Sequence, residues 1–284
     1  MAKNKLYFIG YGHMAEAIYQ RLDKSLFENI FLIEKDDYRR VSIDKKKYGK
    51  TQLLKSLHGI KFCNSDIVIL AVKPNQIKLI CNEINSLIIE KKDLPEVISI
   101  AAGVTTTSIK DYIIQENLSH LQNFLNIYRA MPNLCASNGD SITGLFESSV
   151  SDKSNLKNTV SKIFNSVGEI LWVKKESDLN IVTAISGSGP AYIFYIMEVM
   201  INSAQELGLS EKDAKKLVAM TLIGSGKMAL SIQNLKEQIS KVSSKGGTTE
   251  AALKVFEKEN LNLIFNQAIE AAHAKSKEIS QSNE

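Results

Sequence analysis

The sequence is poor in cysteine and proline, and it carries little net charge. Its 284 residues include three cysteines, four prolines and one tryptophan, and the formal net charge at pH 7 is +4. Widely spaced cysteines without a C-x-x-C pair argue against a disulfide framework and a zinc site, and they indicate a reducing compartment. A small net charge, with both signs spread along the chain, argues against nucleic-acid binding.

We expect neither a membrane span nor a leader segment. No apolar run approaches the ~20 residues of a membrane span, and a strand pattern begins almost at once, which leaves no room for a signal peptide. We therefore expect a cytoplasmic protein that meets neither membrane nor nucleic acid. Cys63, Cys81 and Cys135 are each expected to be small buried hydrophobes. The basic run of residues 45–47 is expected to be a solvated loop.

Apolar runs and helical patterns alternate through the first 175 residues. Strands are expected at residues 5–9, 29–34, 66–72, 96–100, 126–130, 141–145 and 168–173, with helices at 13–22, 75–90 and 153–164. The run DIVILAV is almost continuously apolar, as in a parallel strand that is covered on both faces. This alternation predicts an α/β domain over residues 1–175, built on a doubly wound, Rossmann-like parallel sheet.

No strand pattern follows residue 175. Apolar residues recur at helical spacing over residues 178–207, 211–233, 249–259 and 261–279, so residues 176–284 are expected to form an all-helical domain.

The segment SGSGPAY, which starts at Ser186, places two glycines and a proline inside the first of these helices. Such residues cost about 1 and 3 kcal/mol in a helix interior. Either the helix closely approaches another helix or a ligand, or it is two helices that are broken at Ser188 or Gly189, with Pro190 opening the second. The two interpretations are compatible.

The N-terminal segment LYFIGYGHMAEAI carries the pattern G-x-G-x-x-A between a strand and a helix. Gly10 permits the tight turn, Gly12 lets a pyrophosphate lie against the helix N-terminus, and Ala15 keeps the helix close to the strand. In this context the pattern predicts a dinucleotide site. A plain glycine turn between strand and helix is the alternative.

The segment SSKGGTTEA has the layout of an anion site. Gly246 and Gly247 let the backbone approach a ligand closely, and a helical run follows at once. The first N–H groups of that helix lack partners within it, and its macrodipole favours a carboxylate or phosphate there. The hydroxyls of Thr248 and Thr249 can cap the helix or contact the ligand. On this segment alone, a capped helix after a flexible turn is an equally good interpretation.

An enzyme that uses a nicotinamide dinucleotide transfers a hydride to an acceptor, and reduction of a ketone also needs a proton donor. No strong proton donor is evident in the sequence, and no metal site is expected. His13, His58, His120 and His273 occur in polar or helix-end contexts without metal-ligand spacing, and we interpret them as surface or capping residues. An imine acceptor fits this pattern, because a protonated C=N bond is already electrophilic and its nitrogen keeps the proton. The enzyme then has mainly to position its substrate and exclude water.

Taken together, these segments resemble the pyrroline-5-carboxylate reductase family. The segments FIGYGHMAEAI, ILAVKPNQI, SIAAGV, YRAMPN, SGSGPAY and SSKGGTTEA match the family in order and spacing nearly from end to end. The resemblance implies reduction of L-1-pyrroline-5-carboxylate to L-proline, the last step of proline biosynthesis, with NADPH or NADH. It also implies a homodimer through a helical dimerisation domain, with each site at a chain-to-chain junction and, in some members, assembly into decamers.

The resemblance also implies roles for individual residues. The substrate carboxylate would lie on the N–H groups of Gly247, Thr248 and Thr249, and Thr249 would hydrogen-bond the ring nitrogen. Catalytic roles fall to Thr249 and Lys73, although Lys73 can also be interpreted as a strand-end surface lysine. The implied substrate-binding residues are Ser244, Gly246, Gly247, Thr248 and Thr249. The implied cofactor-binding residues are Gly10, Gly12, His13, Met14, Glu34, Lys35, Ala71, Val72, Lys73, Pro74, Ala101, Ala102 and Asn133.

The sequence departs from the family pattern at two places. Lys245 stands where a proline usually precedes the two glycines, so the loop is expected to be less rigid, and both tighter binding and looser positioning of the carboxylate are open. Glu34 closes the second strand about 20 residues after the glycine turn, where an acid binds the ribose of NAD and repels a 2′-phosphate. Lys35, Arg39 and Arg40 could hold that phosphate instead. We expect NADH to be used at least as well as NADPH.

Two other classes fit part of the pattern. A β-hydroxyacid dehydrogenase shares the plan of the domains, but it needs a catalytic lysine in the first helix of the helical domain, where this chain carries SGSGPAY. A nucleotide-binding module without chemistry, such as a redox sensor, needs no second anion site like SSKGGTTEA.

Overall fold

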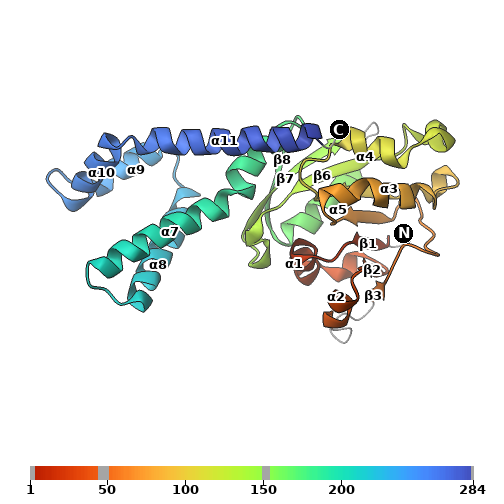
Figure 1. Cartoon of the computed structure of the whole chain (residues 1–284), viewed down its shortest axis with the longest axis horizontal. Coiled ribbons are helices and arrows are strands. Elements are labelled where there is room, and N and C mark those ends of the chain that lie inside the picture. The colour runs from red at the N-terminus through yellow and green to blue at the C-terminus, as the bar shows by residue number, and fades with distance from the viewer. Residues whose placement is uncertain (1–3, 44–50, 149–153, 283–284) are drawn as a thin grey trace. The chain divides into compact units, whose positions relative to one another are not determined.

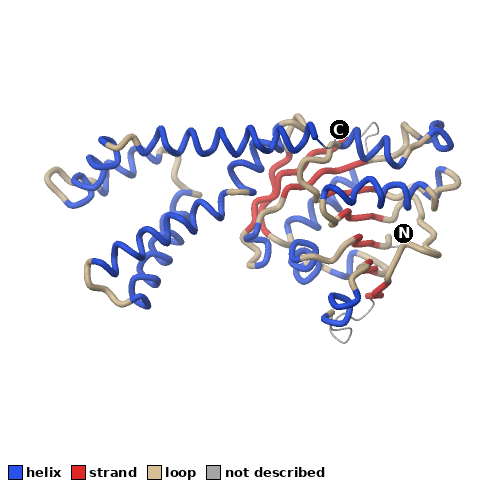
Figure 2. The backbone as a smooth tube through the Cα atoms, viewed as in Figure 1, coloured by secondary structure: helices blue, strands red, loops and turns tan. Residues whose placement is uncertain are grey.

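The computed structural model describes residues 4–43, 51–148 and 154–282. The basic run of residues 45–47 lies outside these described residues. The chain divides into two compact units, Met1–Gly187 together with Ala272–Glu284, and Ser188–Ala271. Figure 2 shows that the strands belong to the first unit and that the second is built from helices.

An eight-stranded sheet forms the centre of the first unit (Figure 1). Its strands are β1 (Leu6–Ile9), β2 (Ile30–Ile33), β3 (Thr51–Leu54), β4 (Ile67–Leu70), β5 (Glu96–Ser99), β6 (Ile127–Met131), β7 (Ser141–Ser148) and β8 (Gly168–Trp172). They lie in the order β3-β2-β1-β4-β5-β6-β7-β8. Neighbouring strands are parallel except for β6 and β7, which are antiparallel, so the prediction of a wholly parallel sheet was wrong at this pair. The connection over residues 132–140 is too short for the crossover that parallel strands need.

The helices are divided between the two units, whose boundary at Gly187 lies after the predicted boundary at residue 175. The first unit contains α1 (His13–Arg21), α2 (Asp37–Ser42), α3 (Ile77–Asn85), α4 (Thr106–Ile113), α5 (Ser154–Asn165) and α6 (Asp178–Val182). The second contains α7 (Gly189–Glu206), α8 (Glu211–Ala229), α9 (Leu235–Val242) and α10 (Thr248–Lys258), and α11 (Leu261–Ser282) runs from the second unit into the first. The predicted fold class is confirmed, although α2, α4, α9 and β3 were not predicted.

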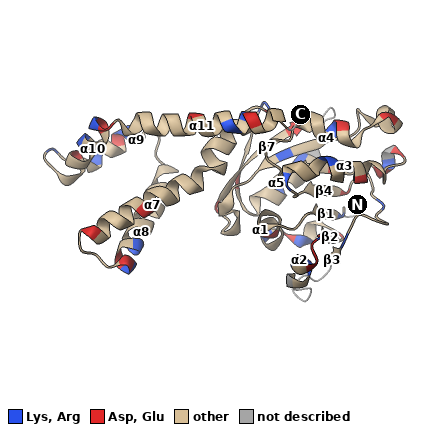
Figure 3. Ribbon diagram, in the orientation of Figure 1, with Lys and Arg blue, Asp and Glu red and all other residues tan. Residues whose placement is uncertain are grey.

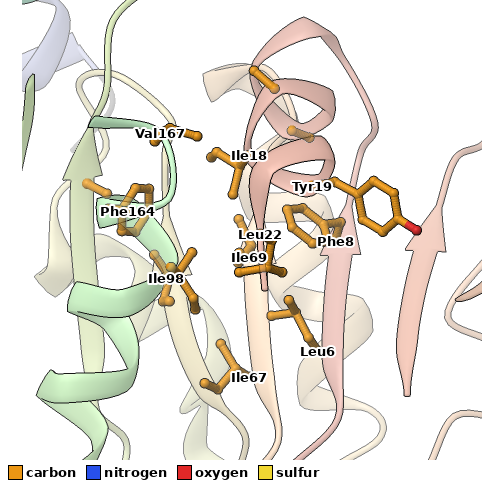
Figure 4. Packing of buried hydrophobic residues seen from close by; sticks show 14 of the residues in the cluster. Leu6, Phe8, Ile18, Tyr19, Leu22, Ile67, Ile69, Ile98, Phe164 and Val167 are labelled. Atoms are coloured by element: carbon orange, nitrogen blue, oxygen red, sulfur yellow. The ribbon is translucent and has the colours of Figure 1, made fainter. Parts of the chain in front are cut away.

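The sheet has a hydrophobic core on each face, because alternate residues of a strand point to opposite sides. Leu6 and Phe8 of β1 pack on one face with residues of α1 and α5 (Figure 4). Tyr7 and Ile9 pack on the other face with residues of α3 and α4. Each fully buried apolar side chain contributes about 1.5–3 kcal/mol. The two cores therefore hold the strand ends firmly in place.

The helix predicted over residues 178–207 is interrupted. After α6 comes a π-helical segment, Thr183–Gly187, and α7 starts after Ser188 with a proline in its first turn. The interpretation of SGSGPAY as a break between two helices is confirmed. A Cβ atom on Gly187 would lie 2.9 Å from Cε of Met131, so this glycine also permits a close approach, to strand β6 rather than to another helix.

One helical stretch of the described residues, Asp178–Glu206, is long and apolar enough to cross a membrane by length and composition. This stretch contains polar residues and is not an uninterrupted apolar run, so the expectation that the chain has no membrane span stays a prediction. Only 6% of its most apolar window is buried, and α7 has no buried residue. Figure 3 shows few charged residues along α7 and the first half of α11. Several large apolar side chains of α7 are exposed, which is typical of a site of interaction.

A largely buried ion pair ties the start of the helical region to the sheet. Nη1 of Arg129, on β6, donates to Oε1 of Glu176 at 3.0 Å. The same carboxylate accepts the backbone N–H and the hydroxyl of Thr106, each at 2.7 Å. Glu176 therefore joins β6 and the first turn of α4 to the segment that precedes α6.

The cysteines differ in exposure. Cys81 is buried, Cys135 is half-buried and Cys63 is exposed, and all three are free thiols. The expectation of a buried thiol is confirmed for Cys81 and wrong for Cys63. Burial raises the pKa of the Cys81 thiol to about 12, which keeps it protonated at neutral pH.

We predict that Gly103→Ala destabilises the protein more than Gly59→Ala does. Both glycines have positive φ, +74° and +79°, so each substitution carries a backbone cost of about 1–2 kcal/mol. A Cβ on Gly103 would also lie 2.5 Å from Cγ2 of Ile279, near the end of α11, whereas nothing lies within 4 Å of one on Gly59. Overpacking should add about 1–3 kcal/mol at Gly103 alone. Urea denaturation at fixed protein concentration measures both; equal losses would contradict the packing of α11 on this loop.

Candidate active site

The carboxyl ends of β1, β2 and β4 meet where the strand order reverses its direction along the sheet. Open α/β sheets bind ligands at this point. Gly10 follows β1 with φ +86°, and a Cβ on it would lie 2.8 Å from both the carbonyl oxygen of Ala71 and Cγ1 of Val72. Only glycine fits there, and it lets the turn after β1 approach the end of β4.

Helix α1 begins at this turn with its first N–H groups uncapped by any side chain. Gly12 is the N-cap residue, with φ −80° and ψ −178°. The nearest atom to a Cβ on Gly12 would be Nη1 of Arg39, at 4.0 Å. An open helix N-terminus beside a guanidinium group suits the pyrophosphate of a dinucleotide.

A hollow of about 470 Å³ opens at these strand ends. Its lining includes Ile9, Gly10, Tyr11, Gly12, Ile33, Glu34, Lys35, Asp36, Arg39, Ala71, Val72, Lys73, Gln76, Leu79 and Ile80. The structure thus brings together the predicted residues Gly10, Gly12, Glu34, Lys35, Ala71, Val72 and Lys73. A second hollow, of about 170 Å³, shares Tyr11, Gly12 and Arg39 with the first and also includes His13, Glu16 and Ile43.

Other predicted cofactor residues lie outside the two hollows. Met14 packs against the core cluster under α1, and Pro74 opens a short 3₁₀ helix, Pro74–Gln76. Ala101, which is buried, and Ala102, which is half-buried, follow β5 at the same edge of the sheet. Contacts of these residues with a nicotinamide ring remain predictions.

Asn133 is engaged in local structure after β6. Its Oδ1 accepts the N–H of Cys135 at 3.0 Å, and its Nδ2 donates to Oγ of Ser186 at 3.0 Å. The side chain therefore joins the end of β6 to the π-helical segment. These hydrogen bonds do not test the predicted position of Asn133 beside the cofactor, which stays a prediction.

Several lining residues were missed from the sequence. Gln76, Leu79 and Ile80 have the spacing of one helical face after AVKP, which is a signal that could have found them. Tyr11 is the middle residue of the glycine turn, and its backbone N–H donates to Oε2 of Glu34 at 3.1 Å. That contact joins residues 23 positions apart and has no local signature.

The glycine-threonine loop is described within the second unit. Gly246 has φ +77°, and Gly247 is the N-cap of α10, with no side-chain cap. The N–H of Gly247 donates to the carbonyl oxygen of Ser244 at 2.9 Å, and the N–H of Gly246 donates to Oε2 of Glu250 at 2.6 Å. In this structure the turn itself uses the Gly247 N–H, and the contact of this donor with a carboxylate stays a prediction.

The donors at this helix end are therefore the N–H groups of the first turn of α10. Thr248 and Thr249 occupy its first two positions, where N–H groups have no intrahelical partner. Thr249 is half-buried and Thr248 is exposed. Neither hydroxyl caps the helix, so both can contact a ligand. The loop can bind an anion through two amides, two hydroxyls and the helix dipole.

Five titratable groups among the described residues have a pKa that is raised by burial or by a neighbouring charge. They are Tyr7, Asp66, Cys81, Lys92 and Tyr128. Burial is the main cause that raises the pKa of Tyr7, Asp66, Cys81 and Tyr128.

Two family models match the chain. Residues 5–103 match the model described as NADP oxidoreductase coenzyme F420-dependent, and residues 176–279 match the model for pyrroline-5-carboxylate reductase dimerisation. Together with the Rossmann-like sheet and its glycine turn, they define the class: an oxidoreductase with an N-terminal dinucleotide-binding domain.

Whole-length relatives specify the family. The chain is 32% identical to a pyrroline-5-carboxylate reductase of Pasteurella multocida, over 98% of each chain. A structure of a pyrroline-5-carboxylate reductase from Coxiella burnetii superposes with a TM-score of 0.83 and 36% identity, covering 99% of each chain. A Plasmodium falciparum pyrroline carboxylate reductase with NADP bound gives 0.80 and 28%, again with 99% coverage of each chain. The chain belongs to the pyrroline-5-carboxylate reductase family, which confirms the resemblance of its motifs.

We predict that Gly12→Ala folds normally but loses dinucleotide affinity, whereas Gly10→Ala loses stability. An added methyl at Gly12 meets no atom closer than 4.0 Å, yet it lies where the backbone should approach the pyrophosphate. NADH titrated calorimetrically into the protein without imine should bind about tenfold or more weakly, a loss of about 1.4 kcal/mol. Thermal unfolding of the free protein is the control. Unchanged affinity in Gly12→Ala would show that the cofactor lies elsewhere.

Proposed function

We propose that this chain reduces L-1-pyrroline-5-carboxylate to L-proline, the last step of proline biosynthesis, with NADPH or NADH as the reductant. The observation that carries the proposal is the presence, in one member of this family, of two uncapped helix N-termini of different kinds. The one at α1 opens into a hollow at the sheet edge. The one at α10 follows a glycine turn and starts with two threonines. The first suits a pyrophosphate and the second a carboxylate.

The cofactor is proposed to lie along the carboxyl ends of the strands. Gly12 and the first turn of α1 would hold the pyrophosphate, and Glu34 would contact the adenosine ribose. Lys73, exposed at the end of β4 and on the wall of the hollow, would border the nicotinamide end. Ala101, Ala102, Pro74, Met14 and Asn133 are proposed to complete that end, and the interpretation of Lys73 as a surface lysine predicts no effect of its removal.

The substrate carboxylate is proposed to bind at the start of α10. The N–H groups of Thr248 and Thr249 are the donors, with the hydroxyl of Ser244 as a further contact. Gly246 and Gly247 keep the loop free of side chains, and a Cβ on Gly247 would lie 2.6 Å from Oγ of Ser244. The ring of the substrate would then lie beside the Thr249 hydroxyl.

The proposed reaction needs little acid–base catalysis by side chains of the protein. When bound, the reduced nicotinamide supplies a hydride to the carbon of the ring C=N bond. Thr249 would accept the N–H of the protonated imine and so orient the ring, and the nitrogen keeps that proton in the product amine. The residues of the site act by positioning the substrate and excluding water.

The chain is proposed to act as a cytoplasmic homodimer. Three free thiols fit a reducing compartment. The residues that the dimerisation model matches, 176–279, include α7, α9 and α10, which bury no residue within the single chain. We propose residues 1–175 as the nucleotide domain and residues 176–284 as the domain for substrate binding and dimerisation. Further assembly into a decamer would show in the same mass measurements as the dimer.

A direct assay tests the reaction. Purified protein is mixed with pyrroline-5-carboxylate and NADH or NADPH, and loss of the reduced-nicotinamide absorbance is followed beside the formation of proline. Stoichiometric conversion supports the proposal. Dinucleotide binding without imine turnover would point to a sensor or structural module instead.

We predict that Thr249→Ala lowers kcat by about tenfold or more, because a hydrogen bond to a charged group is worth about 1.5–3 kcal/mol. Thr249→Ser keeps the hydroxyl and should restore most of the rate. Steady-state kinetics with varied imine measures both variants, and NADH affinity without imine should stay unchanged. Full activity in Thr249→Ala would remove the proposed contact with the ring nitrogen.

We predict that Ile264→Glu disrupts the dimer and that Ile89→Glu does not. Ile264, on α11 within the second unit, is 55% exposed in the single chain, and Ile89, in the first unit, is 78% exposed. A charge buried at an interface without a partner costs several kcal/mol, whereas one in water costs little. Light scattering after size-exclusion chromatography should give a smaller mass for Ile264→Glu alone. A dimer that persists in Ile264→Glu would contradict this interface.

A further inference from the structure

Glu34 is a buried carboxylate at the adenosine end of the hollow. It follows β2, is 8% exposed, and lines the hollow beside the glycine turn. Its Oε2 accepts the N–H of Tyr11 at 3.1 Å, and its Oε1 accepts the N–H of Asp36 at 3.0 Å. Two backbone donors on separate segments fix the carboxylate and stabilise its charge. The negative charge is therefore part of the wall that a bound ribose must face.

The carboxylate retains capacity for further donors. A carboxylate can accept about four hydrogen bonds, and the backbone uses one on each oxygen. Adjacent hydroxyls of a ribose are donors of matching geometry. A 2′-phosphate offers no donor when ionised, and it would bring about two like charges to a place where screening by water is reduced.

The cations of this segment are largely committed to other partners. Nη1 of Arg40 donates to the carbonyl oxygens of Glu34 and Lys35, at 2.8 and 2.9 Å, and its guanidinium pairs with Asp37. The Lys35 ammonium lies 2.8 Å from Oε1 of Glu83. Neither cation is arranged around a vacant place for a phosphate at the end of β2.

Arg39, the third cation of this segment, lies beside the glycine turn. Its Nη1 would lie 4.0 Å from a Cβ on Gly12, and its side chain lines both hollows that flank the glycine turn. This guanidinium therefore lies beside the start of α1, where the pyrophosphate is expected. A cation there attracts every adenine dinucleotide, whether or not its ribose is phosphorylated.

We propose that Glu34 makes this chain select the unphosphorylated dinucleotide, NADH, over NADPH, and that Arg39 serves the pyrophosphate rather than a 2′-phosphate. The inference deepens the proposed function and rests on the same cofactor hollow. It separates this chain from the description of the matching family model, which names NADP, and from the P. falciparum relative, whose structure holds NADP.

The experiment measures binding of two cofactor fragments to the full-length protein without substrate. ADP-ribose and 2′-phospho-ADP-ribose are titrated calorimetrically at fixed ionic strength. We expect ADP-ribose to bind about tenfold or more tightly, given the strength of a like-charge contact at a poorly hydrated site. Equal binding of the two fragments, or tighter binding of the phosphorylated one, by the wild-type protein would overturn the proposal without recourse to any variant.

Glu34→Gln tests the charge, since it keeps the shape and one oxygen acceptor. The preference for ADP-ribose should shrink about tenfold. Glu34→Asp keeps the charge and should retain the preference. Comparison of the two variants therefore separates the loss of the charge from the change of side chain at this position. Glu116→Gln, at an exposed acid of the same unit, changes net charge equally and should leave the preference unchanged. An unchanged preference in a folded Glu34→Gln would overturn the assignment.

Arg39→Ala tests the second half of the proposal. Both fragments should lose affinity by the same factor. A selective loss for 2′-phospho-ADP-ribose would show that Arg39 binds the 2′-phosphate and would overturn the assignment.

The ratio of kcat/KM for NADH to that for NADPH in imine reduction is the kinetic counterpart. Reduction with NADPH alone would overturn this inference and leave the proposed function intact. Tight, selective binding of ADP-ribose without any imine reduction would support this inference and overturn the proposed function.

Discussion

The approach of Gly10 to the end of β4 is the contact on which the cofactor hollow depends. The Gly10 N–H donates to the carbonyl oxygen of Ile33 at 2.8 Å, and the Ala71 N–H donates to that of Ile9 at 2.8 Å. With a Cβ on Gly10 only 2.8 Å from the Ala71 oxygen, no larger residue can occupy the turn. Three strand ends are thereby held at one edge of the sheet. The open start of α1, the position of Glu34 and the wall formed by Val72 all follow from that arrangement.

The glycine turn and the specificity of the site are linked through Glu34. Its carboxylate accepts the middle N–H of the turn, at Tyr11, and that of Asp36 after β2. The same group therefore supports the backbone that is proposed to bind the pyrophosphate, and it would present its charge to the ribose. Because one side chain has both tasks, a change of cofactor preference at this position must also keep the turn intact. The neutral amide of glutamine keeps one acceptor and loses the charge, which separates the two tasks as far as a single substitution can.

The sequence predicted those elements that are determined by residues close together in the chain. Continuous apolar runs indicated the buried strands, and the glycine turn indicated the start of α1. Strand β3 was missed because TQLL is short and half-polar, and α2 because it has only six residues. The antiparallel β7 depends on a tertiary pairing that no period reveals. Nor could the sequence indicate that Glu176 joins Thr106, 70 residues away, or that the Gly247 N–H is used within its own turn.

The two halves of the proposed site have different energetic origins. The cofactor turn rests on two cores buried within one chain, such as those around Phe8 and Val68. By contrast, α7, α9 and α10 bury no residue in the single chain, although Phe256 and Val255 of α10 are apolar and half exposed. Helices in water gain most of their stability from packing an apolar face. In the proposed homodimer, surfaces of the second chain would stabilise the start of α10 and with it the proposed carboxylate site. A single chain would retain its dinucleotide site but bind the imine weakly. Reduction of the substrate would therefore depend on assembly of the proposed dimer.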